Sequence, residues 1–289
     1  MSRPAAKRVP GRPTVTPASD SIYLRRVDLR ARGDADLTRF PFSVPTIRSL
    51  GTLAFASPVT FFVGENGSGK STLLEAIAAA AGSPTVGSDE VASDVSLRAQ
   101  KQLGAHLRLQ WKPRTHRGFF LRAEDFFGFA KRIARVRLEM QQRVRDLDEE
   151  YKDRSSWAKG LAQGPARNSI AAMEERYGED LDAQSHGQSF LQLFRSRFVP
   201  GGLYLLDEPE APLSPQSQLT LIAMLSEMTK QQSQFIIATH SPILLAYPGA
   251  AIYSFDGGKV EAATFEELES VNLVRSFLND PVQYLRHLT

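Results

Sequence analysis

The sequence predicts an α/β fold with parallel core strands and an inserted helical lobe. A short apolar strand at residues 59–63 runs through a glycine-rich loop into an apolar helix that starts at Lys70. Apolar strands at residues 203–206 and 234–239 flank a helical segment, which predicts a right-handed parallel crossover. Residues 124–198 have a mostly helical pattern, and we interpret them as a lobe inserted between the core strands.

The composition is that of an ordinary globular chain. It has 289 residues, of which 42% are hydrophobic and 23% are charged, and a net charge of +3. This length suits one α/β domain with an inserted lobe, or two small domains. The absence of cysteine excludes disulfides, thiolate zinc sites and cysteine nucleophiles, and it fits a cytoplasmic location. No stretch reaches the roughly 20 apolar residues of a membrane helix, so we expect no direct membrane insertion.

The first 19 residues differ from the rest of the chain. They contain four basic residues, four prolines and no acid, a composition that favours disorder. Because they contain no hydrophobic run, they are not a secretory signal. We therefore predict a disordered basic tail over residues 1–20, with contact to nucleic acid as the alternative, and an ordered domain over residues 21–289.

Further strands are predicted on both sides of the glycine-rich loop. Order begins at residues 22–24, and a second strand lies within residues 49–55. Residues 82–102 are polar and small and are predicted to be mostly loop. Residues 107–111 and 118–123 flank a turn-like linker, and we interpret them as an antiparallel pair.

The helical lobe is predicted to be broken near residues 160–165. Its charged stretch contains both signs and few apolar residues, which favours a solvated helix of a small lobe. A long coiled-coil arm would need several sustained heptads, for which there is no room. Four basic residues recur at helical spacing, namely Lys131, Arg132, Arg135 and Arg137. They form a solvated face in the favoured interpretation and contact nucleic-acid phosphates in the other.

The C-terminal part predicts a hairpin and two helices. An Asp-Gly-Gly-Lys turn separates two short runs within residues 251–264. Thr264 and Glu267 form a capping-box pattern that would open a helix. Asp280 and Pro281 are expected at the N-cap and the first position of the last helix.

The glycine-rich loop has the residue types of a phosphate-binding loop. It consists of Gly64, Glu65, Asn66, Gly67, Ser68, Gly69, Lys70, Ser71 and Thr72. Its glycines allow backbone conformations closed to other residues, so the loop amides can turn toward an anion at a helix N-terminus. Lys70 would reach the β- and γ-phosphates of a nucleotide, and the Ser71 hydroxyl would bind Mg²⁺. The pattern therefore predicts a P-loop nucleotide-binding protein.

Two carboxylates follow the strand at residues 203–206. Asp207 and Glu208 lie where this strand ends, and ligands bind at that edge of an open parallel sheet. Asp207 would hold the Mg²⁺ shell, and Glu208 would act as the base toward the attacking water. His240 ends the next parallel strand on the same edge, where it would hydrogen-bond the γ-phosphate or the attacking water. The alternative for each residue is a purely structural role.

The motifs GENGSGKST, LLDEPE and ATHS, in this order, resemble those of ABC-type ATPases. That class includes transporter motor subunits and the chromosome-maintenance and recombination-repair ATPases. The ending VRSFLNDPVQYLRHL and the entry FPFSVP are similar to small stand-alone bacterial predicted ATPases of this class. The resemblance implies a P-loop NTPase fold with an ABC-type mixed core sheet, an N-terminal antiparallel β part and a helical lobe inserted at about residues 124–198.

The resemblance also assigns residues outside the phosphate loop. The serine-rich signature of the class is matched by Ser185, Gly187 and Gln188. His186 stands in place of the first glycine of that signature, and Ser214 stands where an aspartate is usual in the loop that follows the two acids.

Two further assignments follow from the resemblance. Glu124 takes the place of the family's glutamine that touches metal and water, with a solvated strand end as the alternative. Phe40 and Phe42 lie near the place of the aromatic residue that stacks on adenine, but in a different sequence setting.

These assignments imply ATP and Mg²⁺ as ligands and a homodimer that forms on ATP binding. Three candidate functions are consistent with these assignments. In the first, the chain is an ATPase whose dimerisation switches a protein or nucleic-acid partner, as in repair or phage defence. The second is the motor subunit of an ABC transporter, and the third is a nucleotide-gated binding module with negligible turnover. His186 and Ser214 favour the first function over the second, and the intact Glu208 argues against the third.

Overall fold

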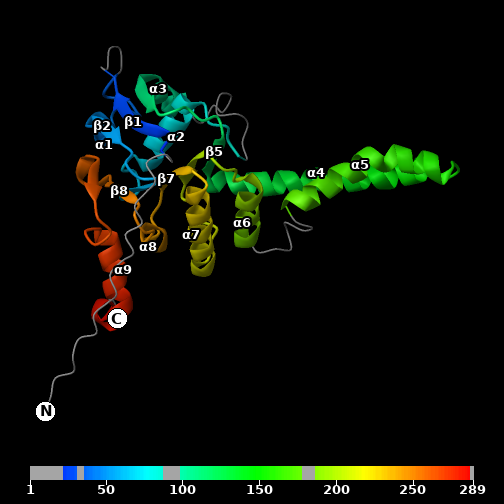
Figure 1. Ribbon diagram of the computed structural model, residues 1–289. Helices are drawn as coiled ribbons and strands as arrows, with labels where there is room; N and C mark the ends of the chain where they lie inside the picture. Colours follow the sequence, from blue (N-terminus) through cyan, green and yellow to red (C-terminus); the bar gives the residue numbers. More distant parts are fainter. Residues whose placement is uncertain (1–21, 31–35, 87–97, 178–185, 287–289) are drawn as a thin grey trace.

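A computed structural model describes residues 22–30, 36–86, 98–177 and 186–286. Two β-sheets lie on either side of one central helix, and a helical arm projects from this body (Figure 1). The strands are β1 (Leu24–Leu29), β2 (Thr52–Ala54), β3 (Val59–Val63), β4 (Leu107–Trp111), β5 (Gly118–Arg122), β6 (Leu203–Asp207), β7 (Gln234–Ala238), β8 (Ala251–Ser254) and β9 (Glu261–Ala263). The helices are α1 (Pro45–Arg48), α2 (Lys70–Ala81), α3 (Arg98–His106), α4 (Ala123–Glu150), α5 (Ser156–Tyr177), α6 (His186–Arg197), α7 (Pro215–Lys230), α8 (Pro242–Leu245), α9 (Glu269–Asn279) and α10 (Pro281–Leu285), with a 3₁₀ turn η3 (Asp256–Gly258). The predicted tail, residues 1–20, lies outside the described residues.

The larger sheet is mixed and has six strands in the order β5-β6-β7-β3-β8-β9. The first five strands of this order run parallel, and β9 pairs antiparallel with β8 as the hairpin at the edge. The β6–α7–β7 unit is the predicted parallel crossover, with Asp207 paired opposite Ala238. Because β3, β6 and β7 run in one direction, the residues that follow them meet at the same edge of the sheet.

The smaller sheet is antiparallel, in the order β2-β1-β4. The strands predicted at residues 107–111 and 118–123 form as β4 and β5, but the prediction that they pair with each other is wrong. β4 pairs with β1, whereas β5 pairs with β6 in the large sheet. The linker between them carries the chain from one sheet to the other. Each strand thereby gains a partner along its whole length.

Two hydrophobic cores cover the two faces of the large sheet. Successive residues of a strand point to opposite faces, so Phe61 joins one core and Phe62 the other. The core around Phe62 contains the apolar face of α2 and the inner face of the antiparallel sheet. The core around Phe61 contains α6, α7 and α8. The alternation of apolar residues in these strands therefore accounts for the layers above and below the sheet.

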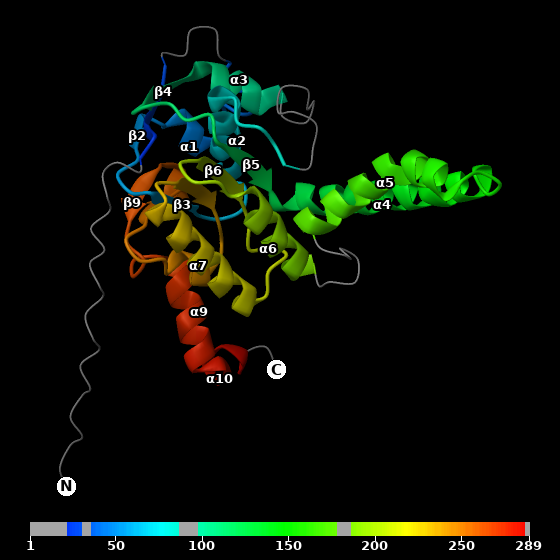
Figure 2. The same ribbon diagram turned by 45° about the vertical axis from the view of Figure 1, so that its right-hand side comes forward.

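The inserted lobe is a helical hairpin that projects from the body as an arm (Figure 2). α4 has 28 residues, or roughly 42 Å at the rise of an α-helix, and α5 packs back along it. The expected break near residues 160–165 is wrong, because Pro165 lies inside α5 and the chain turns back at residues 151–155. Contacts with α4 hold this part of α5: the buried Gln163 amide donates to Val144 O and to Asp148 Oδ1.

The prediction of a small lobe without room for a long arm is therefore also wrong. Polar pairs are among the contacts that join α4 to α5. Arg137 pairs with Glu174 at 2.6 Å, and Lys159 pairs with Asp148 at 2.9 Å. Such pairs replace part of the apolar seam that a coiled coil uses.

The remaining predictions from the sequence hold in part. Residues 82–102 were predicted as loop, and α3 already begins at Arg98, with residues 87–97 outside the described part. Thr264 donates to the Glu267 carboxylate as in a capping box, but this contact closes a turn and α9 begins only at Glu269. Asp280 caps α10 by accepting from Gln283 N, as predicted.

Candidate functional site

The phosphate loop joins β3 to α2, and three of its glycines have positive φ. Gly64, Gly67 and Gly69 have φ of 149°, 78° and 101°, values that L side chains rarely adopt. At Gly69 a Cβ atom would also lie 2.6 Å from Thr46 Oγ1. Glycine is therefore required at this position by both the backbone conformation and the space around it.

Lys70 is the first residue of α2, and its side chain is buried at 4% exposure. Its ammonium group donates to the carbonyl oxygens of Gly64, at 2.7 Å, and Glu65, at 2.8 Å. Burial lowers the pKa of Lys70, while the nearby Glu208 and Asp207 oppose this shift. The cation is thus held within the curve of the loop, where the phosphates of a nucleotide would bind.

Two residues that the sequence analysis did not identify anchor the loop. Thr46, on the short helix α1, donates its hydroxyl to Ser68 O. Asp256, in the turn after β8, accepts from Glu65 N at 3.0 Å. Asp256 was visible only as part of a hairpin turn, so the sequence contained no signal for this contact.

Ser71 and Asp207 meet at the edge of the large sheet. The Ser71 hydroxyl donates to Asp207 Oδ1 at 3.0 Å. Burial raises the pKa of Asp207 to about 7, and the neighbouring Glu75 carboxylate adds to the shift. The Asp207 carboxylate and the Ser71 hydroxyl are hard oxygen donors that suit a divalent cation, which would offset the buried negative charge.

These residues fit Mg²⁺ better than a metal enclosed by protein ligands. Within the described ranges, no group of three or more His, Cys, Asp or Glu side chains is arranged to hold a metal. Mg²⁺ usually takes one or two protein ligands and completes its shell with water and substrate phosphates. Ser71 and Asp207 would supply these protein ligands.

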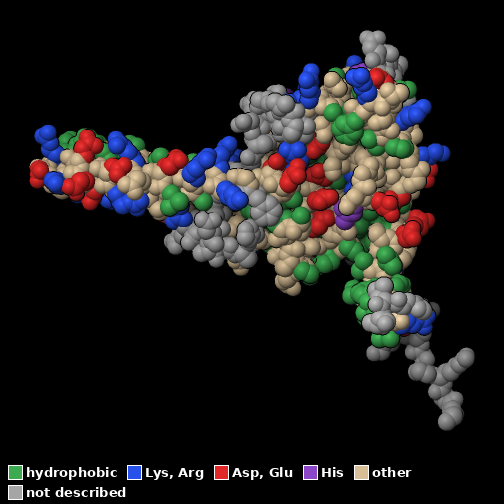
Figure 3. All heavy atoms as spheres, turned by 180° about the vertical axis from the view of Figure 1, so that it is seen from behind, with side chains coloured by type: hydrophobic (Ala, Val, Ile, Leu, Met, Phe, Trp, Pro, Cys, Tyr) green, Lys and Arg blue, Asp and Glu red, His purple; other side chains and the backbone are tan. Residues whose placement is uncertain are grey.

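Glu208 and His240 lie beside each other at the same edge. Glu208 has φ of 49°, an uncommon value for a residue other than glycine, and its carboxylate is 3.6 Å from His240 Nε2. Burial, with Lys70 nearby, lowers the pKa of His240 against the opposing effect of Glu208, which favours the neutral ring. The half-buried Glu210 carboxylate accepts from His240 N at 2.7 Å and thereby fixes the backbone that carries the imidazole. On this face of the molecule, acidic side chains gather on the body beside the C-terminal helices (Figure 3).

Glu124 lies at the start of α4 with its side chain 75% exposed, and its carboxylate contacts Arg122 at 3.5 Å. Its role as a metal ligand stays a prediction. The Glu75 carboxylate, on the phosphate-loop helix, raises the pKa of Asp207, and sequence reasoning missed this residue. An acidic residue at the centre of the apolar α2 pattern was the signal that could have identified it.

Arg122 connects the phosphate-loop helix to the arm. It ends β5, directly opposite Asp207 in the sheet register. Its guanidinium contacts Asp125 Oδ2 at 2.8 Å on the first turn of α4, and Glu75 Oε1 at 3.5 Å on α2. The side chains of Arg122 and Glu75 are only 12% and 7% exposed. A buried charge cluster therefore lies between the predicted metal site and the base of the arm.

The predicted signature falls at the start of α6. Ser185 lies outside the described residues, and Gly187 and Gln188 lie on the first turn. A Cβ at Gly187 would be 3.0 Å from Pro212 O, so glycine lets this turn pack on the loop that follows the two acids. In that loop, Ser214 caps α7 by accepting from Ser217 N, a role that an aspartate would also fill.

The two candidate adenine-contacting residues differ in exposure. Phe42 is buried and packs edge-on against His106, whereas Phe40 is exposed. Phe42 therefore belongs to the core, and of these two rings only Phe40 is accessible to a base.

A phosphate loop, a buried aspartate and an adjacent glutamate at one edge of a parallel sheet define a P-loop nucleotide-binding protein. A family model described as an AAA domain matches residues 46–233, so the chain belongs to this family. An uncharacterized ABC transporter ATP-binding protein from Haemophilus influenzae is 25% identical over 235 residues, which are 76% of this chain and 83% of the relative. These matches confirm the resemblance to ABC-type ATPases.

Solved structures of this class are also similar. One is the Smc head domain with an extended coiled coil from Pyrococcus furiosus, bound to the C-terminal domain of ScpA; its TM-score is 0.45 at 13% identity, covering 88% of this chain and 99% of that one. Another is cbiO1 from Clostridium perfringens, part of the ABC transporter complex cbiONQ; its TM-score is 0.42 at 19% identity, covering 92% of this chain and 98% of that one. Within the described residues, no helix of this chain is long and apolar enough to cross a membrane.

Proposed function

We propose that this chain binds and hydrolyses Mg-ATP, and that an ATP-dependent homodimer switches a protein or nucleic-acid partner. One observation carries the proposal: three functional pairs converge at a single edge of the sheet. They are Lys70 with the loop carbonyls, Ser71 with Asp207, and Glu208 with His240. This arrangement provides charge for the phosphates, ligands for a metal and a base for water.

Each residue has a defined part in the reaction. Lys70 leaves the carbonyls of the loop and offsets the negative charge of the β- and γ-phosphates. Ser71 and Asp207 would hold Mg²⁺, and a bound Mg²⁺ would supply positive charge to offset that of the phosphates. Glu208 accepts a proton from the attacking water, and the neutral His240 hydrogen-bonds that water or the γ-phosphate.

The homodimer would complete the site. In ABC-type ATPases a phosphate loop faces the signature of a second subunit, and Gly187 and Gln188 lie at the start of α6. A helix N-terminus offers backbone amides to an anion. His186 introduces bulk into the signature, so we expect a weaker sandwich than in proteins with the full motif.

The test uses a variant that binds ATP but turns it over slowly. Glu208→Gln keeps the size of the side chain and removes the base, so hydrolysis should slow by about 10²-fold or more and the ATP-bound dimer should accumulate. Size-exclusion chromatography with light scattering, with and without Mg-ATP, measures this. The matched control is Lys70→Ala in the same background, which should stay monomeric.

Two outcomes would contradict separate parts of the proposal. A Glu208→Gln protein that binds ATP yet stays monomeric at tens of micromolar would exclude the homodimer. A wild-type protein that binds ATP but releases no phosphate, alone or with added DNA, would exclude hydrolysis and leave a nucleotide-gated binding module.

A transporter motor subunit is the second candidate, favoured by the description of the Haemophilus influenzae relative. The projecting arm argues against the transporter function, because its helices α4 and α5 have 28 and 22 residues. A motor subunit would use a compact lobe to dock its membrane partner. Affinity purification from the native host distinguishes the two functions. Recovery of a protein with several membrane spans would favour the transporter function.

A further inference from the structure

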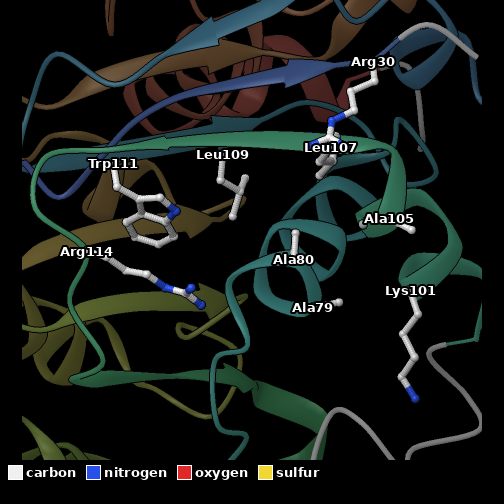
Figure 4. Close-up of a pocket in the computed structure, with 10 residues that line it drawn as sticks. Arg30, Ala79, Ala80, Lys101, Ala105, Leu107, Leu109, Trp111 and Arg114 are labelled. Carbon is white, nitrogen blue, oxygen red and sulfur yellow. The ribbon is translucent and has the colours of Figure 1, made fainter.

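A hollow of about 480 Å³ lies on the inner face of the antiparallel sheet, beside the C-terminal end of α2. It is lined by Arg30, Ala79, Ala80, Lys101, Gly104, Ala105, Leu107, Leu109, Trp111 and Arg114 (Figure 4). The hollow is apart from the phosphate loop, which is at the other end of α2. Nothing in the proposed ATPase reaction uses it.

The sequence of β4 and α2 explains why the hollow exists. Alternation along β4 places Leu107, Leu109 and Trp111 on the inner face of the sheet. α2 ends in a run of alanines, and the methyl groups of Ala79 and Ala80 are too small to fill the space beneath this face. Leu109 and Trp111 are therefore only half-buried, and an apolar floor with one aromatic ring remains accessible.

Three of the lining residues are cations, and they come from three different elements. Arg30 follows β1, Lys101 lies on α3, and Arg114 follows β4 (Figure 4). The Arg114 guanidinium lies over the Trp111 ring, 5.7 Å from its centroid, and donates to Ala81 O at 2.9 Å. No carboxylate is among the described residues that line the hollow. The hollow thus combines positive charge with an exposed aromatic surface.

The positive charge extends beyond the hollow along the chain. Residues 98–117 contain no acidic residue and six basic ones, namely Arg98, Lys101, Arg108, Lys112, Arg114 and Arg117. Alternation along β4 places Arg108 on the opposite face of the sheet from Trp111, in register with Asp28. By contrast, residues 123–154 of the arm contain eight basic and eight acidic residues. Basic and acidic side chains are interspersed along the arm, while basic ones gather at the end of the body that holds the antiparallel sheet (Figure 3).

The arm is therefore a poor site for a polyanion. Several of its cations are paired with its own carboxylates, as in Arg135 with Glu139, Arg137 with Glu174, Lys152 with Glu149, and Lys159 with Asp148. A phosphate would have to displace these carboxylates. The basic face predicted on the arm is consequently best interpreted as a solvated face.

We propose that the hollow and the basic surface around it bind single-stranded nucleic acid. A cationic surface that follows the phosphates, together with an aromatic ring for a base, is the combination that single-strand-binding proteins use. A base must leave its stack to enter the hollow, which excludes a paired duplex. Because the lining cations come from three separate elements, a strand with several phosphates can contact more of them than a single nucleotide can. The inference names the contact surface for the nucleic-acid partner of the proposed function, but it requires no ATP.

Trp111 provides the first readout. The chain has two tryptophans, and Trp157 is 76% exposed on α5, so Trp157→Phe leaves Trp111 as the only tryptophan. Added oligodeoxythymidylate should quench its fluorescence, and the affinity should fall steeply with salt because phosphate contacts release counterions. A duplex of the same length and thymidine monophosphate should both bind more weakly. Inorganic polyphosphate should bind without the same quenching, because it has no base.

Variants of the lining residues test whether the oligonucleotide binds in the hollow. The affinity of each variant is measured by the fluorescence anisotropy of a labelled oligonucleotide. Trp111→Ala should weaken binding by about tenfold, within the range for one lost stacking contact. Arg30→Ala should reduce the salt slope by about 0.7, the value for one phosphate contact on a single strand. Ala80→Leu fills the hollow without changing any charge and should weaken binding to the same extent as Trp111→Ala.

The matched control is the double variant Arg132→Ala, Arg135→Ala on the arm, which should bind as wild type. The proposal is overturned if this variant loses more affinity than those of the hollow, or if the folded Trp111→Ala and Ala80→Leu proteins bind as wild type. Tighter binding of the duplex, or equal quenching by polyphosphate, also overturns it. Lys70→Ala, tested without nucleotide, should retain oligonucleotide binding, so failure of this inference and failure of the ATPase proposal can be told apart.

Discussion

Arg122 allows a sharp test of how the buried charges at the base of the arm are balanced. Its guanidinium contacts Glu75 and Asp125, and all three side chains are at most 14% exposed. Arg122→Met keeps an unbranched stem of similar length but removes the charge. Glu75 would then be a buried carboxylate without its cation. Removing one partner of a buried ion pair costs about 3–5 kcal/mol.

We expect a loss at the lower end of this range, about 3 kcal/mol at pH 8. Burial already raises the pKa of Glu75, and Arg122 lowers it. In the Met variant this pKa should rise further, so the carboxyl can take up a proton and limit the cost. A carboxyl whose folded-state pKa is raised favours the folded state as the pH falls through that pKa. The deficit should therefore be smaller at pH 5.5 than at pH 8.

Thermal unfolding followed by circular dichroism measures this. With about 2–4 °C per kcal/mol for a chain of this size, the Met variant should melt about 6–12 °C below wild type at pH 8. Arg122→Met combined with Glu75→Gln should recover part of the loss, because an amide carries no charge. Arg135→Met, on the exposed face of the arm, is the control and should change the stability by less than about 0.5 kcal/mol. A deficit below about 1 kcal/mol, or one independent of pH, would refute the reasoning.

Three further predictions concern the nucleotide site and its support. Lys70→Ala should abolish binding of a fluorescent ATP analogue in a protein that stays folded, because the loop keeps its glycines but loses the charge that offsets the phosphates; unchanged affinity would remove Lys70 from the site. Because burial and Lys70 lower the pKa of His240, kcat should fall in acid, as the pH drops through this lowered pKa and the ring gains a proton. A kcat that rises as the pH falls would argue against a role for the neutral ring. Ser214→Ala should lower stability by about 1 kcal/mol through loss of the α7 cap, and Ser214→Asp should not; equal melting temperatures would show that the cap contributes nothing.

The sequence by itself determined the features that depend on neighbouring residues. The run from Val59 to Ala81 shows a strand, a loop and a helix in continuous order, and all three form as predicted. The same holds for β6, α7 and β7, whose apolar runs identify both the strands and their parallel direction. Because Asp207, Glu208 and His240 directly follow these strands, their meeting at one sheet edge could also be predicted. The roles of these residues, and of Ser185, Gly187, Gln188 and Glu124, stay predictions.

The tertiary structure alone decided which distant residues meet. Nothing near β4 or β5 in the sequence shows that they enter different sheets, since that choice depends on the strands already available at each edge. The arm was underestimated for a similar reason, because its stability comes from contacts between α4 and α5 rather than from heptads within either helix.

The support of the nucleotide site likewise depends on contacts across long stretches of chain. Glu75 meets Arg122 at a separation of 47 residues, and Glu65 N donates to Asp256 at a separation of 191. A local pattern carries information about the few residues that share a strand or a turn of helix. The phosphate loop, the carboxylates of Asp207 and Glu208, and His240 are local features, so the sequence could predict them. The charge cluster around Arg122 and the hollow beside the antiparallel sheet form only when the layers pack together.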